Sequence, residues 1–397
     1  MKLILNASLF EYDIRGLLMA FYPWQKFETD PEAEDPMGLS VLYSGDTGSA
    51  RGRGDVPVQL TAEIVLWDRT VDYAEERSVF LDLSDKSAAK TLLKRTVYGL
   101  LSAKTGRTLP WGTLTGIRPT KIATGMMEAG ASDEEILRHM EEDLLCSHRK
   151  AALSVDISKR ERALIASSDG PDGYSIYVGI PFCPTRCLYC SFTAYPIDAF
   201  RGILPAYMES LERELLLIRD LLGGKKLNTV YFGGGTPTSP GAEDLDRILG
   251  FIEDHFDLSH LREWTVEAGR PDSVTPEKLD ALKCHPVTRI SVNPQTMHQK
   301  TLDLIGRKHT VQQVIDTYTL ARRKGFDNIN MDLILGLPGE DAADVRETMR
   351  MVTALDPDSV TVHSLAVKRS SRLNLEKERY QGYSMEKIGR ASCRERE

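Results

Sequence analysis

Three cysteines lie close together near the middle of the chain, at Cys183, Cys187 and Cys190. They follow residues 175–180, a short stretch with the pattern of a strand. The spacing C-x3-C-x2-C puts three thiolates on one tight loop after that strand, which suits a [4Fe–4S] cluster. Three ligands leave one iron open. That iron can bind the amino and carboxylate groups of S-adenosylmethionine, so the loop is suited to radical chemistry.

A zinc site is the main alternative for these cysteines. A closed tetrahedral zinc site needs a fourth Cys or His, and none follows Cys190 before His255. Zinc completed by a distant residue and a chance grouping of cysteines both remain open, although the spacing favours the iron–sulfur cluster.

A glycine-rich stretch, residues 233–238 (GGGTPT), ends the second predicted strand of the same region. Glycines at a strand end let backbone N–H and C=O groups approach a ligand closely, because no side chain blocks them. A phosphate-binding loop is the alternative, but the Gly-Lys-Ser/Thr ending is missing and no helix starts at once. Beside an open cluster, this stretch is placed to hold the methionyl ammonium of S-adenosylmethionine.

Polar residues recur at the ends of the next strands. Glu267 ends the third strand, Gln295 and then Arg307 follow the fourth, and Asp332 lies inside the apolar fifth strand. A polar group that faces inward costs free energy unless it is paired. A salt bridge within the fold would explain each residue singly, but their recurrence at successive strand ends favours one shared site.

Strands and helices alternate through this part of the chain. This repeat predicts a parallel sheet with right-handed crossovers, either a barrel or a partial barrel, whose chemistry gathers at the C-terminal ends of the strands. Two helix starts are well marked, by Thr275-Pro276 and by the capping-box pair Thr310 and Gln313. Strands are expected at 175–180, 229–232, 264–268, 289–292, 328–335 and 359–364, with helices at 204–222, 245–256, 276–283, 311–324 and 342–355.

The region before it, residues 1–172, predicts a separate α+β domain. We expect a strand at 2–6, a helix at 9–21, a loop at 32–55, two or three strands within 56–83, and a helix at 85–104 capped by Ser84. A second helical stretch, 121–168, contains a capping-box pair at Ser132 and Glu135.

Residues 109–121 (LPWGTLTGIRPTK) form the most distinctive motif of this first region. Its Gly and Pro content predicts a shaped loop, from which Trp111, Arg118 and Lys121 could reach a ligand or the second domain. The alternative is a simple helix-entry loop with a packed tryptophan.

Composition excludes several classes of protein. Hydrophobic residues are 41% and charged residues 27% of the 397 residues, and the net charge is −8. These values are ordinary for a globular protein and argue against a nucleic-acid partner. No run reaches the roughly 18 apolar residues of a membrane helix. Six cysteines are too few for a disulfide framework, so we expect a cytoplasmic protein.

The combined motifs resemble the radical SAM family, and within it the oxygen-independent coproporphyrinogen III oxidase group, over about residues 174–375. The motif at 109–121 resembles the HemZ-type branch, named coproporphyrinogen dehydrogenase. The resemblance implies an α/β fold in which a partial (β/α)6 barrel at 173–386 follows a smaller α+β domain at 1–172.

It also implies the roles of individual residues and the cofactors, a [4Fe–4S] cluster and S-adenosylmethionine. Cys183, Cys187 and Cys190 would ligate the cluster, and Tyr177 matches a catalytic-site tyrosine that contacts the cosubstrate. The cosubstrate itself would be bound by Tyr189, Gly234, Gly235, Thr236, Glu267, Gln295, Arg307 and Asp332.

The implied reaction abstracts a β-hydrogen from substrate propionates and releases carbon dioxide and an electron, which converts coproporphyrinogen III to protoporphyrinogen IX. The implied partners of the monomeric protein are this tetrapyrrole and a reduced flavodoxin or ferredoxin-like electron donor. Two positions depart from the oxidase pattern, because Gly179 replaces a histidine and Phe192 replaces a further cysteine. Phe192 is shared with the haem-chaperone branch, so a haem-binding chaperone without decarboxylase activity is the second hypothesis, and a radical enzyme with an unrelated substrate is the third.

The last residues, 387–397 (KIGRASCRERE), resemble read-through of a sequencing adapter. We expect them to be non-native and the natural C-terminal part to be missing. A lid over the barrel mouth would then be absent, so the chain should bind its cluster but turn over poorly.

Overall fold

The computed structural model describes residues 1–23, 25, 27–29, 35–45, 59–116 and 118–380. The chain divides into two compact units, Met1–Ser167 and Ser168–Glu397. The tail at 387–397 that the sequence suggests to be non-native lies outside the described residues. Among the described residues, no helix is long and apolar enough to cross a membrane.

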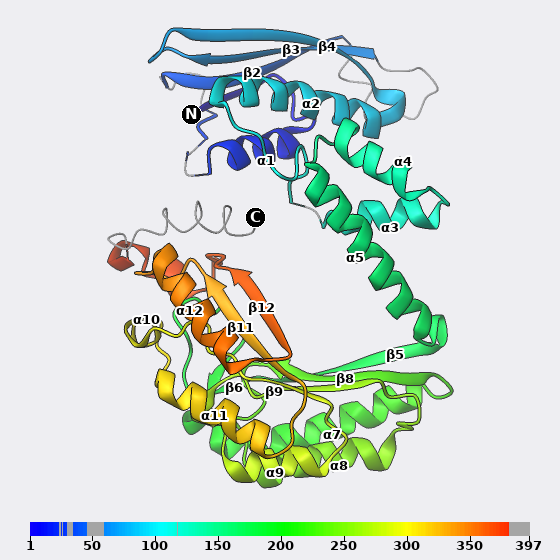
Figure 1. Ribbon diagram of the computed structural model, residues 1–397, viewed down its shortest axis with the longest axis vertical. Helices are drawn as coiled ribbons and strands as arrows, with labels where there is room; N and C mark the ends of the chain where they lie inside the picture. The colour runs from blue at the N-terminus through cyan, green and yellow to red at the C-terminus, as the bar shows by residue number, and fades with distance from the viewer. Residues whose placement is uncertain (24, 26, 30–34, 46–58, 117, 381–397) are drawn as a thin grey trace. The chain divides into compact units, whose positions relative to one another are not determined.

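The first unit is built on a four-stranded sheet in the order β1-β2-β3-β4. The first two strands are parallel and the others antiparallel. Two helices pack their apolar residues on one face of this sheet (Figure 1). The elements are β1 (Lys2–Leu5), α1 (Glu11–Phe21), β2 (Met37–Gly45), β3 (Gln59–Asp68), β4 (Tyr73–Asp82) and α2 (Lys86–Thr105).

Two sequence predictions in this unit are wrong. Strand β2 occupies part of the expected loop at 32–55, because Leu39 and Val41 are buried against the helices and its backbone pairs on both sides. Pairing with the two neighbouring strands therefore outweighs the low strand propensity of the Gly and Ser residues in that segment. The N-cap of α2 is Asp85, whose carboxylate accepts from two backbone N–H groups, and Ser84 lies in the preceding 3-10 turn.

The rest of the first unit is helical and has a small core of its own. The expected capping box of Ser132 and Glu135 is present. Trp111 packs against this core, with the Lys150 ammonium 5.5 Å from its ring centroid, whereas Arg118 and Lys121 are exposed. This arrangement favours the reading of a helix-entry loop with a packed tryptophan. The helices are α3 (Thr120–Glu128), α4 (Asp133–Arg138) and α5 (His148–Ser167), with a π-helical turn at His139–Asp143.

The second unit contains a six-stranded, all-parallel sheet in the order β12-β11-β10-β9-β8-β5 (Figure 1). All six predicted strands and all five predicted crossover helices are present. The strands are β5 (Gly173–Ile180), β8 (Lys226–Gly234), β9 (Glu263–Glu267), β10 (Arg289–Ser291), β11 (Ile329–Leu335) and β12 (Ser359–Ser364). The helices are α7 (Leu204–Leu221), α8 (Ala242–His255), α9 (Pro276–Cys284), α11 (Val311–Arg323) and α12 (Ala342–Leu355).

Successive side chains of these strands point to opposite faces of the sheet. On β5, Ile176 and Val178 are buried in the core beneath the helices, whereas Ser175 and Gly179 are exposed. The same alternation places polar residues of the other strands on the inner face. Short elements that the sequence did not predict complete this unit: β6 (Phe182–Cys183), β7 (Tyr195–Pro196), α6 (Ile197–Phe200), α10 (Gln299–Leu304) and α13 (Arg372–Leu375).

Candidate functional site

A cavity of about 590 Å³ lies in the second unit, along the inner face of the sheet and at the C-terminal ends of the strands. Every cysteine and every cofactor-binding residue predicted from the sequence lines it, and the predicted catalytic residue Tyr177 does not. The predicted residues that it brings together are Cys183, Cys187, Tyr189, Cys190, Gly234, Gly235, Thr236, Glu267, Gln295, Arg307 and Asp332.

The three cysteines carry free thiols on the loop after β5. The Thr236 hydroxyl donates to the Cys183 sulfur at 3.2 Å, and an Arg270 guanidinium N–H reaches the Cys187 sulfur at 3.8 Å. Burial raises the pKa of the Cys183 and Cys190 thiols. Because a hydroxyl donor and a cation favour the thiolate form, the loop already contains groups that would stabilise negatively charged sulfur.

The glycine-rich stretch is pressed against the cysteine loop. The backbone N–H of Gly235 donates to the Ile180 carbonyl, and that of Thr236 to the Phe182 carbonyl, both at 2.7 Å. A Cβ atom on Gly235 would lie 2.7 Å from the Phe182 carbonyl oxygen and 3.1 Å from the Cys183 sulfur. Gly234 has φ +102°, which L side chains rarely adopt. Glycine is therefore needed here for close approach and not for flexibility.

These features fit an iron–sulfur cluster at the cysteines. Among the described residues, no three His, Cys, Asp or Glu side chains are grouped so as to hold a single metal ion. The three thiols instead line a cavity of about 590 Å³ together with a hydroxyl donor and a buried guanidinium. Thiolates with hydrogen-bonded sulfurs are the donor set of iron–sulfur clusters, and Gly234 and Gly235 line the same cavity beside them.

An aromatic pair supports the acidic side of the cavity. The Tyr231 hydroxyl donates to a Glu267 carboxylate oxygen at 2.6 Å. Burial raises the pKa of Glu267, and this hydrogen bond opposes that effect. Tyr177 stacks on Tyr231, with ring centroids 5.6 Å apart and 64% of the residue exposed. Tyr177 therefore contacts a residue that lines the cavity but does not line the cavity itself.

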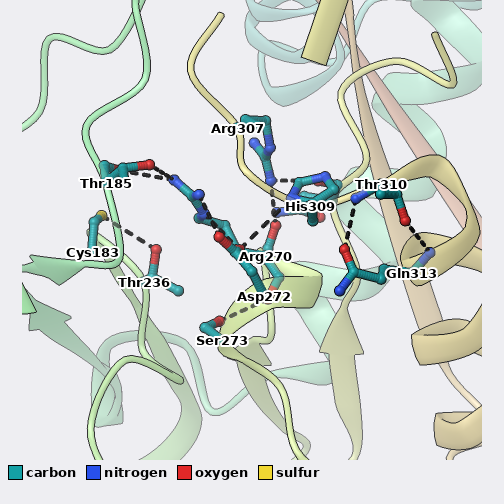
Figure 2. A network of polar contacts seen from close by, with 12 residues as sticks. Cys183, Thr185, Thr236, Arg270, Asp272, Ser273, Arg307, His309, Thr310 and Gln313 are labelled. Carbon is teal, nitrogen blue, oxygen red and sulfur yellow. Dashed lines mark hydrogen bonds and ion pairs between the residues drawn. The ribbon is translucent and has the colours of Figure 1, made fainter. Parts of the chain in front are cut away.

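Arg307 is a deeply buried cation of the wall. It is 4% exposed and donates to the carbonyls of Gly269 at 2.8 Å and Asn293 at 2.7 Å, and to the Tyr189 hydroxyl at 3.3 Å. Its Nε and the Asn293 Oδ1 are buried without a hydrogen-bond partner. Buried polar atoms are nearly always paired, so a polar ligand in this cavity would satisfy groups that the protein leaves open. Figure 2 shows Arg307 above the network that leads to the cysteine loop.

Backbone hydrogen bonds to β11 fix the position of Gln295. It has φ +68°, and its N–H donates to the Asp332 carbonyl at 2.9 Å. The N–H of Ile334 donates in turn to the Gln295 carbonyl at 2.9 Å. The chain thus pairs again with β11 after β10 has ended, and this pairing holds Gln295 beside Asp332. The Asn330 amide donates to the Asp332 carboxylate at 2.7 Å.

Sequence reasoning missed several residues of the wall. Arg270 is 3% exposed and follows Glu267 at the same strand end, so the strand-end argument could have found it. Arg289 and Asn330 lie at inner-face positions of β10 and β11, where the alternation was a usable signal. The basic residues on irregular segments or on the edge strand gave no such signal; they are Arg186, His363 and Lys368.

The second unit matches a known family. Residues 177–352 match the model of the Radical SAM superfamily. Over 319 residues, 77% of this chain and 63% of the relative, the sequence is 41% identical to the oxygen-independent coproporphyrinogen-III oxidase-like protein HemZ of Bacillus subtilis (strain 168). It is 36% identical over 195 residues to the heme chaperone HemW of the same organism, which covers 49% of this chain and 51% of that protein.

A solved structure is also similar. Coproporphyrinogen III oxidase (HemN) from Escherichia coli, described as a radical SAM enzyme, matches with a TM-score of 0.46 and 25% identity over 52% of this chain and 46% of that chain. The chain spans 63% of the HemZ protein and about half of the other curated relative. Residues 177–352 therefore form a radical SAM domain, and enzymes of that superfamily use a [4Fe–4S] cluster and S-adenosylmethionine.

Proposed function

We propose that this chain is an oxygen-independent coproporphyrinogen III dehydrogenase of the HemZ type. The reaction is the oxidative decarboxylation of substrate propionates to vinyl groups, which gives protoporphyrinogen IX. One observation carries the proposal: the cavity that holds the three cysteines is also lined by Arg289, His363 and Lys368. A substrate that carries several carboxylates would find two cationic side chains, Arg289 and Lys368, in the same cavity. The 41% identity to the HemZ protein supports the same reaction.

Each part of the cavity has a proposed task. Cys183, Cys187 and Cys190 would ligate the cluster, which together with S-adenosylmethionine supplies a 5′-deoxyadenosyl radical when both are bound. The backbone of Gly234 and Gly235 would hold the methionyl ammonium, because no side chain separates it from their carbonyls. The remaining cosubstrate contacts would come from Tyr189, Thr236, Glu267, Gln295, Arg307 and Asp332.

The cationic residues would position the substrate. The Arg289 Nε is buried without a hydrogen-bond partner, while one of its terminal nitrogens donates to the Ser359 hydroxyl at 3.2 Å. A propionate carboxylate could pair with this guanidinium and orient its neighbouring methylene toward the radical source. Tyr177, stacked on Tyr231 beside the cavity, would support the cosubstrate from behind.

Anaerobic turnover tests the proposal. After anaerobic reconstitution, the chain should form 5′-deoxyadenosine, carbon dioxide and the vinyl product from reductant, S-adenosylmethionine and coproporphyrinogen III. Arg289→Gln should weaken substrate binding and raise KM while the iron content stays unchanged. Arg350→Gln, which removes an exposed ion pair with Glu347, is the matched control and should behave as the unmodified chain. Formation of 5′-deoxyadenosine without any vinyl product would reject this substrate.

A haem-binding chaperone is the second candidate. Phe192 lines the cavity with 69% of the residue exposed, at the position where the oxidase pattern has a further cysteine. An exposed aromatic ring suits stacking on a porphyrin plane, and the HemW protein is 36% identical. Stoichiometric haem binding that Phe192→Ala weakens, together with no decarboxylation, would favour this candidate. Absence of haem binding would remove it.

We further infer that a reduced flavodoxin or a ferredoxin-like protein donates the electron and that the chain acts as a monomer. The family resemblance supports both statements. Sedimentation velocity tests the second, and cluster reduction by purified flavodoxin or ferredoxin tests the first. A stable dimer, or a cluster that only dithionite reduces, would contradict them.

A further inference from the structure

Arg270 is a buried cation that none of the proposed cosubstrate or substrate contacts uses. It is 3% exposed and lies just beyond the end of β9. Its Nε and Nη2 donate to the two carboxylate oxygens of Asp272 at 3.0 and 2.7 Å. Behind Asp272, the fully buried His309 places its Nδ1 3.7 Å from the same carboxylate. The guanidinium is therefore held in one orientation by its bidentate partner (Figure 2).

The remaining edge of the guanidinium faces the cysteine loop. Its Nη1 donates to the Thr185 carbonyl at 2.8 Å and to the Thr185 hydroxyl oxygen at 2.9 Å. The Thr185 hydroxyl donates onward to the Gly306 carbonyl at 3.0 Å. Thr185 lies midway between Cys183 and Cys187, so Arg270 fastens the centre of the loop that carries the thiols.

The same nitrogen lies 3.8 Å from the Cys187 sulfur. A guanidinium stays protonated at any pH at which the protein is folded. Asp272 touches the guanidinium on the opposite edge from this sulfur, so the positive end of the ion pair points toward the thiols and the negative end away from them.

We propose that Arg270 is a positioning residue that fixes the cysteine loop and raises the reduction potential of the cluster bound there, and that Asp272 moderates this effect. One-electron reduction adds a negative charge to the cluster, and an adjacent cation stabilises the reduced form. The carboxylate behind the cation partly cancels its field. This inference rests on the proposed cluster site and not on the proposed substrate.

The test is a potentiometric titration of the full chain after anaerobic reconstitution, with dithionite as reductant and the EPR signal of the reduced cluster as readout. Arg270→Gln should shift the midpoint potential to a more negative value, and Asp272→Asn should shift it to a more positive one. Arg270→Lys keeps the charge, so its potential should lie closer to that of the unmodified chain, although its iron content should fall because lysine cannot make the same fork of hydrogen bonds.

Arg322→Gln is the matched control, because it breaks another Arg–Asp pair, with Asp358, in the same unit and leaves the cysteine loop untouched. Its potential should not change. A purely structural role would lower the iron content of both Arg270→Gln and Asp272→Asn without shifts of opposite sign, and shifts that are absent or of the same sign would overturn the inference. If Arg270→Gln does not fold, the Asp272→Asn variant alone tests the inference. A midpoint potential of Asp272→Asn that equals that of the unmodified chain, or is more negative, would reject the inference. An unmodified chain that binds no iron would instead reject the cluster site itself.

Discussion

In each unit one face of the sheet packs against helices, and the two units differ in what the opposite face does. In the first unit, Leu60, Ile64 and Leu66 of β3 are buried under the helices, and Glu63 between them is exposed on the other face. In the second unit, the residues that alternate with the buried ones line a cavity. Glu267 of β9 and Asp332 of β11 are examples.

This difference shows what alternation means in a parallel sheet. Parallel strands that are covered on both faces read as continuous apolar runs. The strands of the second unit alternate instead, because their inner face lines a cavity and carries polar groups. The outer face supplies stability through residues such as Phe232 and Trp264, both fully buried. Stability and chemistry are therefore carried by neighbouring residues of the same strands.

The strongest test of this division is to remove a thiol from the inner site. Cys190→Ala should abolish cluster binding and all 5′-deoxyadenosine formation, because the proposed site then has only two protein ligands. Iron and sulfide analysis after reconstitution provides the measurement. Cys284→Ala is the control, because that thiol is exposed on α9, and it should bind a full cluster. Equal iron content in the two variants would contradict the assignment.

Two adjacent residues of β11 sharpen the comparison between the faces. Met331 is fully buried on the outer face, so Met331→Ala should lower the free energy of unfolding by about 2–5 kcal/mol. Asp332→Asn keeps the shape of the inner side chain and should change stability by less than about 1 kcal/mol, while S-adenosylmethionine binding weakens. Urea denaturation and equilibrium dialysis separate the two effects. Similar losses of stability in both variants would break the distinction between the faces.

A pH test probes the start of the second unit. Lys226 and Asn228 hydrogen-bond to the Asp169 carboxylate and lower its pKa to about 2. Because this value lies below the unfolded value of about 3.9, the contribution is present above pH ~4 and is lost as the pH falls toward 2. Asp169→Asn should therefore flatten the acid side of the stability curve. Parallel curves for the variant and the unmodified chain, measured by urea midpoints, would refute this.

The smallest expected effect lies in the first unit. Gly99 is an exposed residue within α2, and a Cβ atom there would meet nothing within 4 Å. Gly99→Ala should stabilise the first unit by roughly 0.5–1 kcal/mol through helix propensity. Differential scanning calorimetry would detect the shift, and turnover should stay unchanged. An altered turnover would indicate that the first unit contributes to the chemistry of the second.

The sequence predicted the fold of the second unit because its signals are local. Strand alternation and the Thr310–Gln313 capping box require no knowledge of distant partners, and both are present. The positions of Glu267 and Asp332 followed from the rule that parallel strands end at one edge. Strand β2 was missed because its formation depends on neighbours on both sides, which composition does not reveal.

The site was predicted less completely than the fold. Arg307 follows α10, and Leu302 of that helix packs in a small core with Ile305 just after it. This path was not readable from the sequence. The strand-end position of Arg270 could be read from the sequence, but its burial could not, because that burial results from the pairing with Asp272 and Thr185. Such contacts exist only after the chain has folded.

The left-handed backbone at Gln295 has a consequence for protein engineering. The backbone N–H and C=O of Gln295 hydrogen-bond to β11, whereas the residue also lines the cavity. The architecture therefore depends on the backbone at this position and not on the side-chain amide. Residues that tolerate positive φ, such as asparagine, aspartate and glycine, form a small saturation library for position 295. Such a library would test whether the side chain at position 295 contributes to ligand binding while the sheet pairing stays in place.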